Sequence, residues 1–446
     1  MNHIFQKILI FLFSGLMFLG CYFLLATPRI EFWTIFLLYS GLFLGMIALY
    51  YAFRMRFSLW IIFLIGLGMR LSSGFLFPNL SEDYARFLWD GKLILKGENP
   101  YRETPRAWLE NPQNKPSADM EDLLEKLNSP DYFSVYPPLN QAIFGIAAKI
   151  GGESLMGGIL ALRVLLLLGE LGVFFLFLRL LRLFDSSKNQ LIWYWLNPFV
   201  VMEIVGNLHF EGMILGFLLV SVLAIRKRQF GISGGFWGLA VGLKLLPLIL
   251  GPGFFFFQQI KKNRIFWLVF ALVMGLSFFP LILGESYGKF LESLSLYSGK
   301  FEFNASVYYL LREIGFWIQG YNMIGDLTKV LSSLTLVLVF YFSWKKRQEK
   351  VTDLLELMVV TYLTYLILQP VVHPWYILPG LGLSVLAKKK TFIFWSFGAV
   401  FSYQAYGNPE NWENPLWLML EYGMVLLGIY LDYFQPKRNP NFETKN

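Results

Sequence analysis

The stretches "SLWIIFLIGLGMRLSSGFLFP" (residues 58–78) and "SEDYARFLWDGKLILKGENPY" (residues 81–101) are neighbours in the chain, and their contrast indicates the kind of fold. The first is almost entirely apolar and long enough to cross a bilayer as a helix. The second carries four acids, which are Glu82, Asp83, Asp90 and Glu98. An arginine and several aromatic residues lie between them. A membrane-crossing chain therefore presents an acidic segment to water.

The composition of the whole chain agrees with a membrane protein. Of its 446 residues, 56% are hydrophobic and 15% are charged, and the mean hydropathy is +0.52. Soluble proteins carry about 25% charged residues. Many windows of about 20 residues are nearly free of charge, and the alternation typical of a barrel is absent. We therefore predict an all-α, polytopic protein with one integral-membrane domain over residues 1–446. Its first apolar run lacks a cleavage site and is expected to be retained.

The distribution of basic residues predicts the topology. The net charge of +8 comes largely from clusters in short loops, such as residues 226–228 and 388–390. Such loops mark cytoplasmic ends, so they argue for a membrane protein and against a nucleic-acid partner. We expect about 12–14 helices, the first three at 7–25, 32–53 and 58–77, and two external loops at about 78–137 and 284–315. Residues 138–152 should lie along the outer interface, and Lys244 should join two short helices near the outer face.

This topology gathers the unusual polar residues on the outer side, where ionisable groups near lipid are functional hypotheses by default. No nucleotide-binding loop, HExxH or GxSxG motif is present, and a single cysteine, Cys21, excludes a cysteine metal site. We predict no cofactor and no metal. What remains is a carboxylate with scattered cations, which suits glycosyl transfer from a lipid phosphate: a base for the acceptor hydroxyl and a clamp for the leaving phosphate.

Several short motifs resemble the mannosyltransferase-like branch of the bacterial GT-C superfamily, whose members use polyprenyl-phosphate sugars. They are "DYARFLWDG" with "GENPY", "YPPLNQ", "NPFVVMEIVGNLHFEG", "KLLP", "FNASVYYLLR" and "HPWY", and they occur in this order between residues 83 and 376. Phe210 and Glu211 depart from the Asn-Asp pair of the branch, and the acidic loop follows the third predicted helix, not the first. The resemblance implies a GT-C transmembrane bundle with an external catalytic loop.

The resemblance also implies an activity: inverting transfer of a hexose, with mannose expected, from a β-linked polyprenyl-phosphate donor to a glycan or lipid-linked acceptor. The site would face the outside of the cytoplasmic (inner) membrane. Asp83 is the expected general base, with Glu82 as the alternate. Donor-phosphate contacts are expected from Arg86, Lys244, His373 and His209. Contacts to the sugar or acceptor are expected from Trp89, Asp90, Tyr136, Gln141, Asn207, Trp375 and Tyr376.

Each of these residues also has a purely structural interpretation. Asp83 could cap a helix that starts near Ser81, and Arg86 could simply pair with Asp83. Lys244 could extend to the interface, and the tryptophans could form an aromatic belt. Arg163 and Glu170 are expected to pair inside the bundle.

Three other functions stay open, and one of them is a non-catalytic scaffold. A transporter or flippase for a lipid-linked sugar should show an internal repeat and ionisable groups near the midplane, and we find no repeat. A membrane acyltransferase would need a histidine-led site, for which His373 is the candidate.

Overall fold

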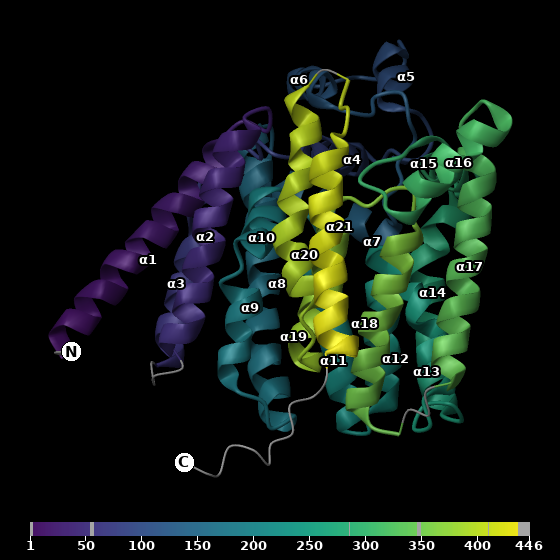
Figure 1. Cartoon of the computed structure of the whole chain (residues 1–446). Helices are drawn as coiled ribbons and strands as arrows, with labels where there is room; N and C mark the ends of the chain where they lie inside the picture. Colours follow the sequence, from purple (N-terminus) through teal and green to yellow (C-terminus); the bar gives the residue numbers. More distant parts are fainter. Residues whose placement is uncertain (1–2, 54–57, 285, 346–348, 409, 436–446) are drawn as a thin grey trace, which may run out of the picture.

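The computed structural model describes residues 3–53, 58–284, 286–345, 349–408 and 410–435 as a bundle of helices (Figure 1). Within those residues the only β-type pairing is an isolated bridge between Phe303 and Val371. Among the described residues, six helices are long and apolar enough to cross a membrane. They are α2 (Phe32–Phe53), α8 (Leu155–Leu183), α14 (Arg264–Leu283), α17 (Ile324–Lys345), α18 (Val351–Leu368) and α21 continued by η6 (Pro415–Ile429, Tyr430–Phe434). The predicted all-α membrane fold is confirmed.

Further apolar helices accompany these spans. They are α1 (His3–Ala26), α3 (Leu59–Leu71), α12 (Phe230–Leu243), η3 with α13 (Leu246–Leu250, Gly251–Phe256) and η4 with α19 (Pro374–Ile377, Leu378–Ala387). One bent pair of helices is a further candidate span. If all of these cross the membrane, the total reaches the lower end of the predicted 12–14.

The first three helices match the prediction, except that α3 ends six residues early. The hydroxyls of Ser72 and Ser73 bond back to the carbonyls of Met69 and Arg70, both at 2.7 Å. A serine hydroxyl that donates to a backbone carbonyl three residues earlier takes the place of the next backbone N–H donor, which favours the end of a helix. Gly74 follows with φ +34°, which turns the chain toward the acidic segment.

The predicted first external loop is itself partly helical. It contains α4 (Asp83–Leu95), α5 (Pro105–Glu110) and α6 (Ala118–Lys126), and it is followed by α7 (Pro138–Gly151). α4 packs closely on α7 at Gly91, where an added Cβ would lie 2.3 Å from the carbonyl oxygen of Phe144. Only glycine permits this approach, so it fixes α4 against the bundle. The interfacial position of α7 stays a prediction.

The apolar segment that precedes α11 is broken into short pieces. They are η1 (Lys188–Leu191), α9 (Ile192–Trp195), α10 (Pro198–Val201) and a π-helical turn, η2 (Met202–Gly206). α11 (Glu211–Arg226) then leaves at 110° to the Pro198–Gly206 segment. π-turns of this kind occur frequently at functional sites. Here the bend places Asn207 and His209 in a connection between two helices.

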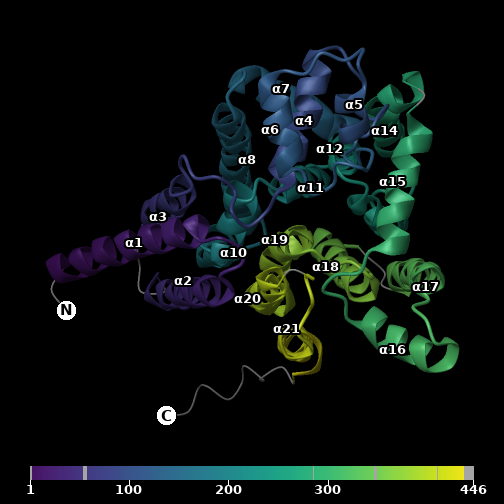
Figure 2. The same cartoon turned by 90° about the horizontal axis from the view of Figure 1, so that it is seen from above.

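The remaining helices are α15 (Tyr287–Lys300), α16 (Val307–Gln319), α20 (Thr391–Gly398) and η5 (Ala399–Gly407). α5, α6, α15 and α16 lie toward the same end of the bundle in Figure 1. Seen from above (Figure 2), α4–α8, α11 and α12 form one group and α17–α21 another, with α19 beside α11. Lys244 lies at the junction of α12 and η3, as predicted.

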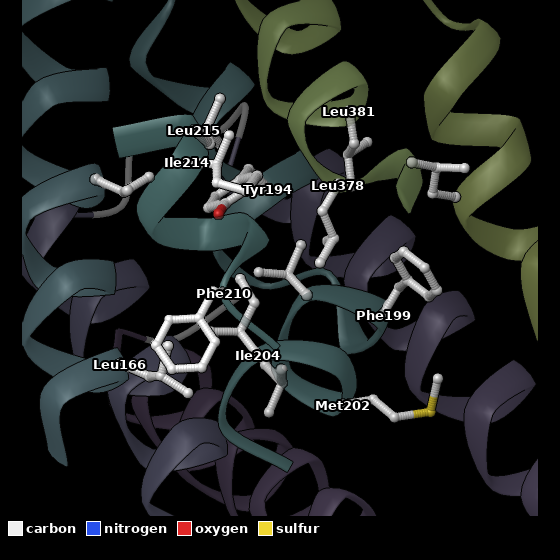
Figure 3. Close-up of a cluster of buried hydrophobic side chains, with 14 of the residues drawn as sticks. Leu166, Tyr194, Phe199, Met202, Ile204, Phe210, Ile214, Leu215, Leu378 and Leu381 are labelled. Carbon is white, nitrogen blue, oxygen red and sulfur yellow. The ribbon is translucent and has the colours of Figure 1, made fainter. Parts of the chain in front are cut away.

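A buried apolar cluster holds the two groups together. Figure 3 shows Phe199, Met202 and Ile204 in the same cluster as Leu215 of α11 and Leu381 of α19. Arg70 and Glu170 form a fully buried ion pair behind it, at 2.7 Å. The expected pairing of Arg163 with Glu170 is therefore wrong. Arg163 donates instead to the carbonyls of Gly74, Leu76 and Val205, because the turn after α3 lies within its reach.

Candidate active site

Asp83 is the first residue of α4, and its carboxylate does not cap the helix. The N-cap is Glu82, which makes no side-chain cap bond, and the Oγ of Ser81 accepts from the backbone N–H of Asp83 at 3.3 Å. The Oδ1 of Asp83 accepts from the amide of Asn128 at 3.3 Å. The Asp83 side chain is 21% exposed, so it stays within reach of a ligand.

Behind Asp83 lies His209, and behind His209 lies Glu203. The Nε2 of His209 is 3.6 Å from Oδ2 of Asp83, and its Nδ1 is 3.0 Å from Oε2 of Glu203. Exposure falls along this chain from 21% at Asp83 to 3% at His209 and 0% at Glu203. Glu203 also accepts from the Tyr403 hydroxyl at 2.6 Å and from the Asn207 amide at 3.0 Å.

This arrangement favours a charged imidazole ring. A carboxylate lies near each ring nitrogen, and the Oγ of Ser81 is also 3.4 Å from Nε2. A doubly protonated ring directs an N–H toward both carboxylates. Burial by itself would raise the pKa of Asp83, but the hydrogen bonding and positive charge of His209 hold that pKa below its usual value. Asp83 is therefore ionised at neutral pH, and its charge points from the buried chain toward the open side.

The second histidine approaches from the α18–α19 junction. Trp375 stacks on His209, with ring centroids 3.8 Å apart, and on His373, at 4.6 Å. Burial and the charge of Lys244 lower the pKa of His373 to about 4, so the ring is neutral at pH 7. Its Nδ1 is buried and makes no hydrogen bond to any residue that the structure describes. A neutral ring with one nitrogen free can still donate to or accept from a ligand.

Lys244 is held at the edge of the same site. Its ammonium is ion-paired with Glu211 and lies 3.8 Å from the ring centroid of Tyr376. The Lys244 side chain is partly exposed, whereas that of Glu211 is buried. Lys244 was predicted to bind the donor phosphate. Its partner Glu211 is one of the two residues that depart from the Asn-Asp pair of the GT-C branch.

Arg29, in the short connection between α1 and α2, is a cation that the sequence prediction missed. Its guanidinium is 2.5 Å from the Glu82 carboxylate and 5.0 Å from the ring centroid of Tyr406. Glu82 thus faces Arg29, whereas Asp83 faces His209, which favours Asp83 as the base. A basic residue on a predicted outer loop departs from the positive-inside rule, and this departure was the available signal.

Other predicted ligands lie on the buried face of α4 and on α7. Asp90 is fully buried and accepts from Arg86 at 2.8 Å, Ser134 at 2.6 Å and Gln141 at 2.7 Å. Arg86 also donates to the Tyr132 carbonyl, not to Asp83. These groups fix the external loop on α4, and the Nη2 of Arg86 and the Oε1 of Gln141 are buried without a hydrogen-bond partner among the residues that the structure describes.

The two aromatic residues predicted in this region also pack inside the protein. Trp89 is fully buried and meets Trp108 edge-on. Tyr136 is half-buried and meets Phe87 and Phe144 edge-on. Their roles in sugar binding stay predictions that this packing does not favour.

Glu203 and Tyr403 were not predicted. Glu203 stands alone in the apolar run "NPFVVMEIVGN", and an isolated acid in a span is a functional hypothesis in itself. Tyr403 gave no comparable signal. Among the residues that the structure describes, no group of three or more histidine, cysteine or acidic side chains is arranged to hold a metal ion.

Comparison with known proteins links this region to sugar transfer. Residues 71–258 match a family described as alpha-(1->6)-mannopyranosyltransferase, N-terminal domain. The chain is 27% identical over 164 residues to alpha-(1->6)-mannopyranosyltransferase B of Corynebacterium glutamicum. The matched segment covers 36% of this chain and 26% of the relative. It is 25% identical over 179 residues to alpha-(1->6)-mannopyranosyltransferase A of the same organism, covering 39% and 34%.

The chain thus spans between a quarter and about a third of the length of these relatives. No solved structure matches. Since the matched relatives are mannosyltransferases, the resemblance to the mannosyltransferase-like branch of the GT-C superfamily is confirmed for residues 71–258. Asp83, Glu203, His209 and Lys244 lie inside that range, whereas Arg29, His373 and Tyr403 lie outside it.

Proposed function

We propose that this protein is a membrane glycosyltransferase that moves mannose from a polyprenyl-phosphate donor to a glycan or lipid-linked acceptor. The reaction inverts the anomeric carbon and takes place at the outer face of the cytoplasmic membrane. The observation that carries the proposal is the chain Asp83–His209–Glu203, which lies within the region similar to mannosyltransferases and ends in a partly exposed carboxylate.

The chemistry assigned to Asp83 is that of a general base. The acceptor hydroxyl oxygen attacks the anomeric carbon, its proton passes to the Asp83 carboxylate, and the bond between that carbon and the phosphate oxygen breaks. The phosphate leaves with the electron pair of that bond. The names of the relatives specify an α-linked product, which a β-linked donor yields by inversion.

His209 positions the base and does not replace it. The ring is 3% exposed and both nitrogens are directed at carboxylates, so it cannot reach an acceptor while Asp83 stands in front of it. Its positive charge keeps Asp83 ionised, and Glu203 keeps the ring charged and oriented. A base with a lowered pKa accepts a proton less readily but is present in its active form at all pH values near neutrality.

The leaving phosphate requires positive charge. Arg86 is committed to Asp90 and His373 is neutral, so the cations with exposed surface at this site are Lys244 and Arg29. Each is paired with a glutamate, Lys244 with Glu211 and Arg29 with Glu82. A phosphate would compete with Glu211 or Glu82 for them, and such contacts are strong because both partners are charged.

The direct test is transfer by the purified protein in detergent, with labelled polyprenyl-phosphate-mannose and a panel of acceptors. We expect labelled product together with free polyprenyl phosphate. Movement of the intact lipid across a reconstituted bilayer, without cleavage, would show a flippase and contradict the proposal.

A further inference from the structure

We propose that a hollow beside the Asp83 segment binds a sugar residue of the acceptor glycan; this inference rests on the proposed function. The hollow has a volume of about 430 Å³ and lies where α2 begins, η5 ends and the chain approaches α21. Sites for small ligands have volumes of about 300–1,000 Å³. The lining residues used in the argument are Glu31, Trp33, Gln404, Asn408, Trp412 and Asn414.

The lining offers the chemistry that a sugar uses. The side chains of Trp33 and Trp412 are 63% and 59% exposed, so each indole has surface available for the C–H face of a pyranose. The side-chain oxygen of Gln404 accepts from the backbone N–H of Asn414 at 3.2 Å. The amide NH₂ of Gln404 makes no hydrogen bond among the residues that the structure describes and can donate to a hydroxyl.

The charge of the lining selects a neutral ligand. Glu31 is the one ionisable residue that lines the hollow, and its carboxylate is exposed. A carboxylate accepts hydrogen bonds from sugar hydroxyls but repels a phosphate or an anionic lipid headgroup. The hollow therefore fits an uncharged polyhydroxyl ring better than it fits the donor phosphate.

The position of the hollow connects it to the candidate base. Its residues Ile30 and Glu31 directly follow Arg29, and Gly407 directly follows Tyr406. Arg29 lies over the Tyr406 ring and is paired with Glu82, the neighbour of Asp83. The Tyr406 ring also packs against Tyr403, with ring centroids 5.7 Å apart, and Tyr403 donates to Glu203 in the chain behind Asp83. An acceptor of two or more sugars can thus place one ring in the hollow while a hydroxyl of another reaches Asp83.

The competing interpretation is that the two tryptophans anchor the protein at the membrane interface. Trp33 does pack against Trp417, with ring centroids 5.6 Å apart, as an interfacial aromatic cluster would. An interfacial anchor contacts lipid and has no preference for a sugar. Kinetics with a soluble acceptor separate the two interpretations.

The experiment uses the full-length protein in detergent with the methyl glycoside of α-(1→6)-mannobiose as acceptor. In Trp412→Ala and in Gln404→Ala, the KM for this acceptor should rise about 3- to 10-fold, and the KM for the lipid donor should not. Trp317→Ala is the matched control, because Trp317 is 87% exposed on α16 and does not line the hollow. An unchanged acceptor KM in both variants would overturn the inference.

A binding measurement keeps this inference separate from the proposed function. Saturation-transfer NMR should detect contact between the mannobioside and the wild-type protein, and Trp412→Ala should reduce the signal. That result would support the hollow even if the transfer assay gave no product. Equal signals from both proteins, or no signal from the wild type, would overturn it.

Discussion

The Nε2 of His209 lies 3.6 Å from the Oδ2 of Asp83, while the opposite ring nitrogen of His209 is 3.0 Å from Glu203. A positively charged ring thus sits between a buried carboxylate and a partly exposed one. The carboxylates of Asp83 and Glu203 together carry one more charge than the His209 ring neutralises. The net negative charge is available at Asp83, because Asp83 is the exposed end of the chain. This distribution gives the candidate site a base that faces a substrate.

Replacing Asp83 by asparagine tests this base. The amide keeps the shape of the side chain and can still accept from Asn128, but it cannot take a proton. We expect kcat to fall by about 10²–10⁴-fold, the usual contribution of general-base catalysis, with thermal stability nearly unchanged. Steady-state kinetics and a melting curve measure both quantities.

Glu82→Gln is the matched control for that variant, because Glu82 is one residue away and paired with Arg29. A larger loss of activity there than in Asp83→Asn would move the base by one residue. Normal transfer by Asp83→Asn would contradict the assignment of this loop as catalytic.

Glu203→Gln should move the acid limb of the pH profile. Asp83 acts as a carboxylate, so activity is lost as pH falls through its pKa, which His209 holds below the usual 3.8. Glutamine can still accept from the ring but no longer favours its positive charge. The pKa of Asp83 should then rise, and the acid limb of kcat/KM should shift upward by about 1–2 pH units.

The control for this shift is Glu421→Gln. Glu421 is also buried, but it accepts from Asn304 and Trp395 and is not part of the chain behind Asp83. Its pH profile should match that of the wild type. A Glu203→Gln profile with the same acid limb as the wild type would show that the buried carboxylate does not act through His209.

Much of the fold could be predicted because its signals are local. Apolar length and basic loops predicted the spans, and α4 begins two residues from the expected Ser81. Asp83 was proposed as the base in the same way, since it stands in a short acidic segment, and that assignment stays a prediction. Lys244 was expected at a helix junction because a proline follows it three residues later.

The partners of these residues could not be predicted, because they depend on tertiary packing. Tyr403 meets Glu203 across 200 positions of sequence. The π-turn that holds Glu203 and the 110° bend after it bring Glu203 under His209, and neither has a signal in the local sequence. The spacing of Arg163 and Glu170 suggested a pair, but Arg70 from α3 takes Glu170.

The membrane orientation can be tested by single-cysteine labelling. Cys21 is the one cysteine of the chain and is buried, so Cys21→Ala gives a clean background. We expect a membrane-impermeant maleimide to label Lys115→Cys in intact cells and Lys227→Cys only after permeabilisation. Both positions are exposed, so reactivity reports the side of the membrane. Labelling of position 115 from the cytoplasm alone would contradict both the topology and the site.

Activity should not depend on a divalent cation. The oxygens of Asp90 already accept from Arg86, Ser134 and Gln141, and Glu82 is paired with Arg29, which leaves Asp83 as the one acid of this group open to a ligand. One carboxylate is a poor site for calcium or magnesium, which prefer several oxygen ligands. Transfer measured with EDTA and without it should agree. Loss of activity in EDTA, restored by added magnesium or manganese, would identify Glu82, Asp83 and Asp90 as metal ligands.

The last prediction concerns the leaving phosphate and Lys244. Lys244→Ala should weaken donor binding, but it also leaves Glu211 buried without its partner, which destabilises a protein strongly. The double variant Lys244→Met with Glu211→Gln removes both charges and keeps the packing on Tyr376. We expect its donor KM to rise about 10- to 100-fold, which corresponds to roughly 1.5–3 kcal/mol for a charge-assisted contact.

Glu211→Gln alone provides the comparison. It removes the glutamate that competes with the phosphate and leaves Lys244 free, so its donor KM should fall below that of the wild type. A donor KM that is unchanged in the double variant would show that Lys244 serves only to neutralise Glu211. Arg29 would then be the remaining partly exposed cation beside Asp83, and Arg29→Met with Glu82→Gln would be the next pair to measure.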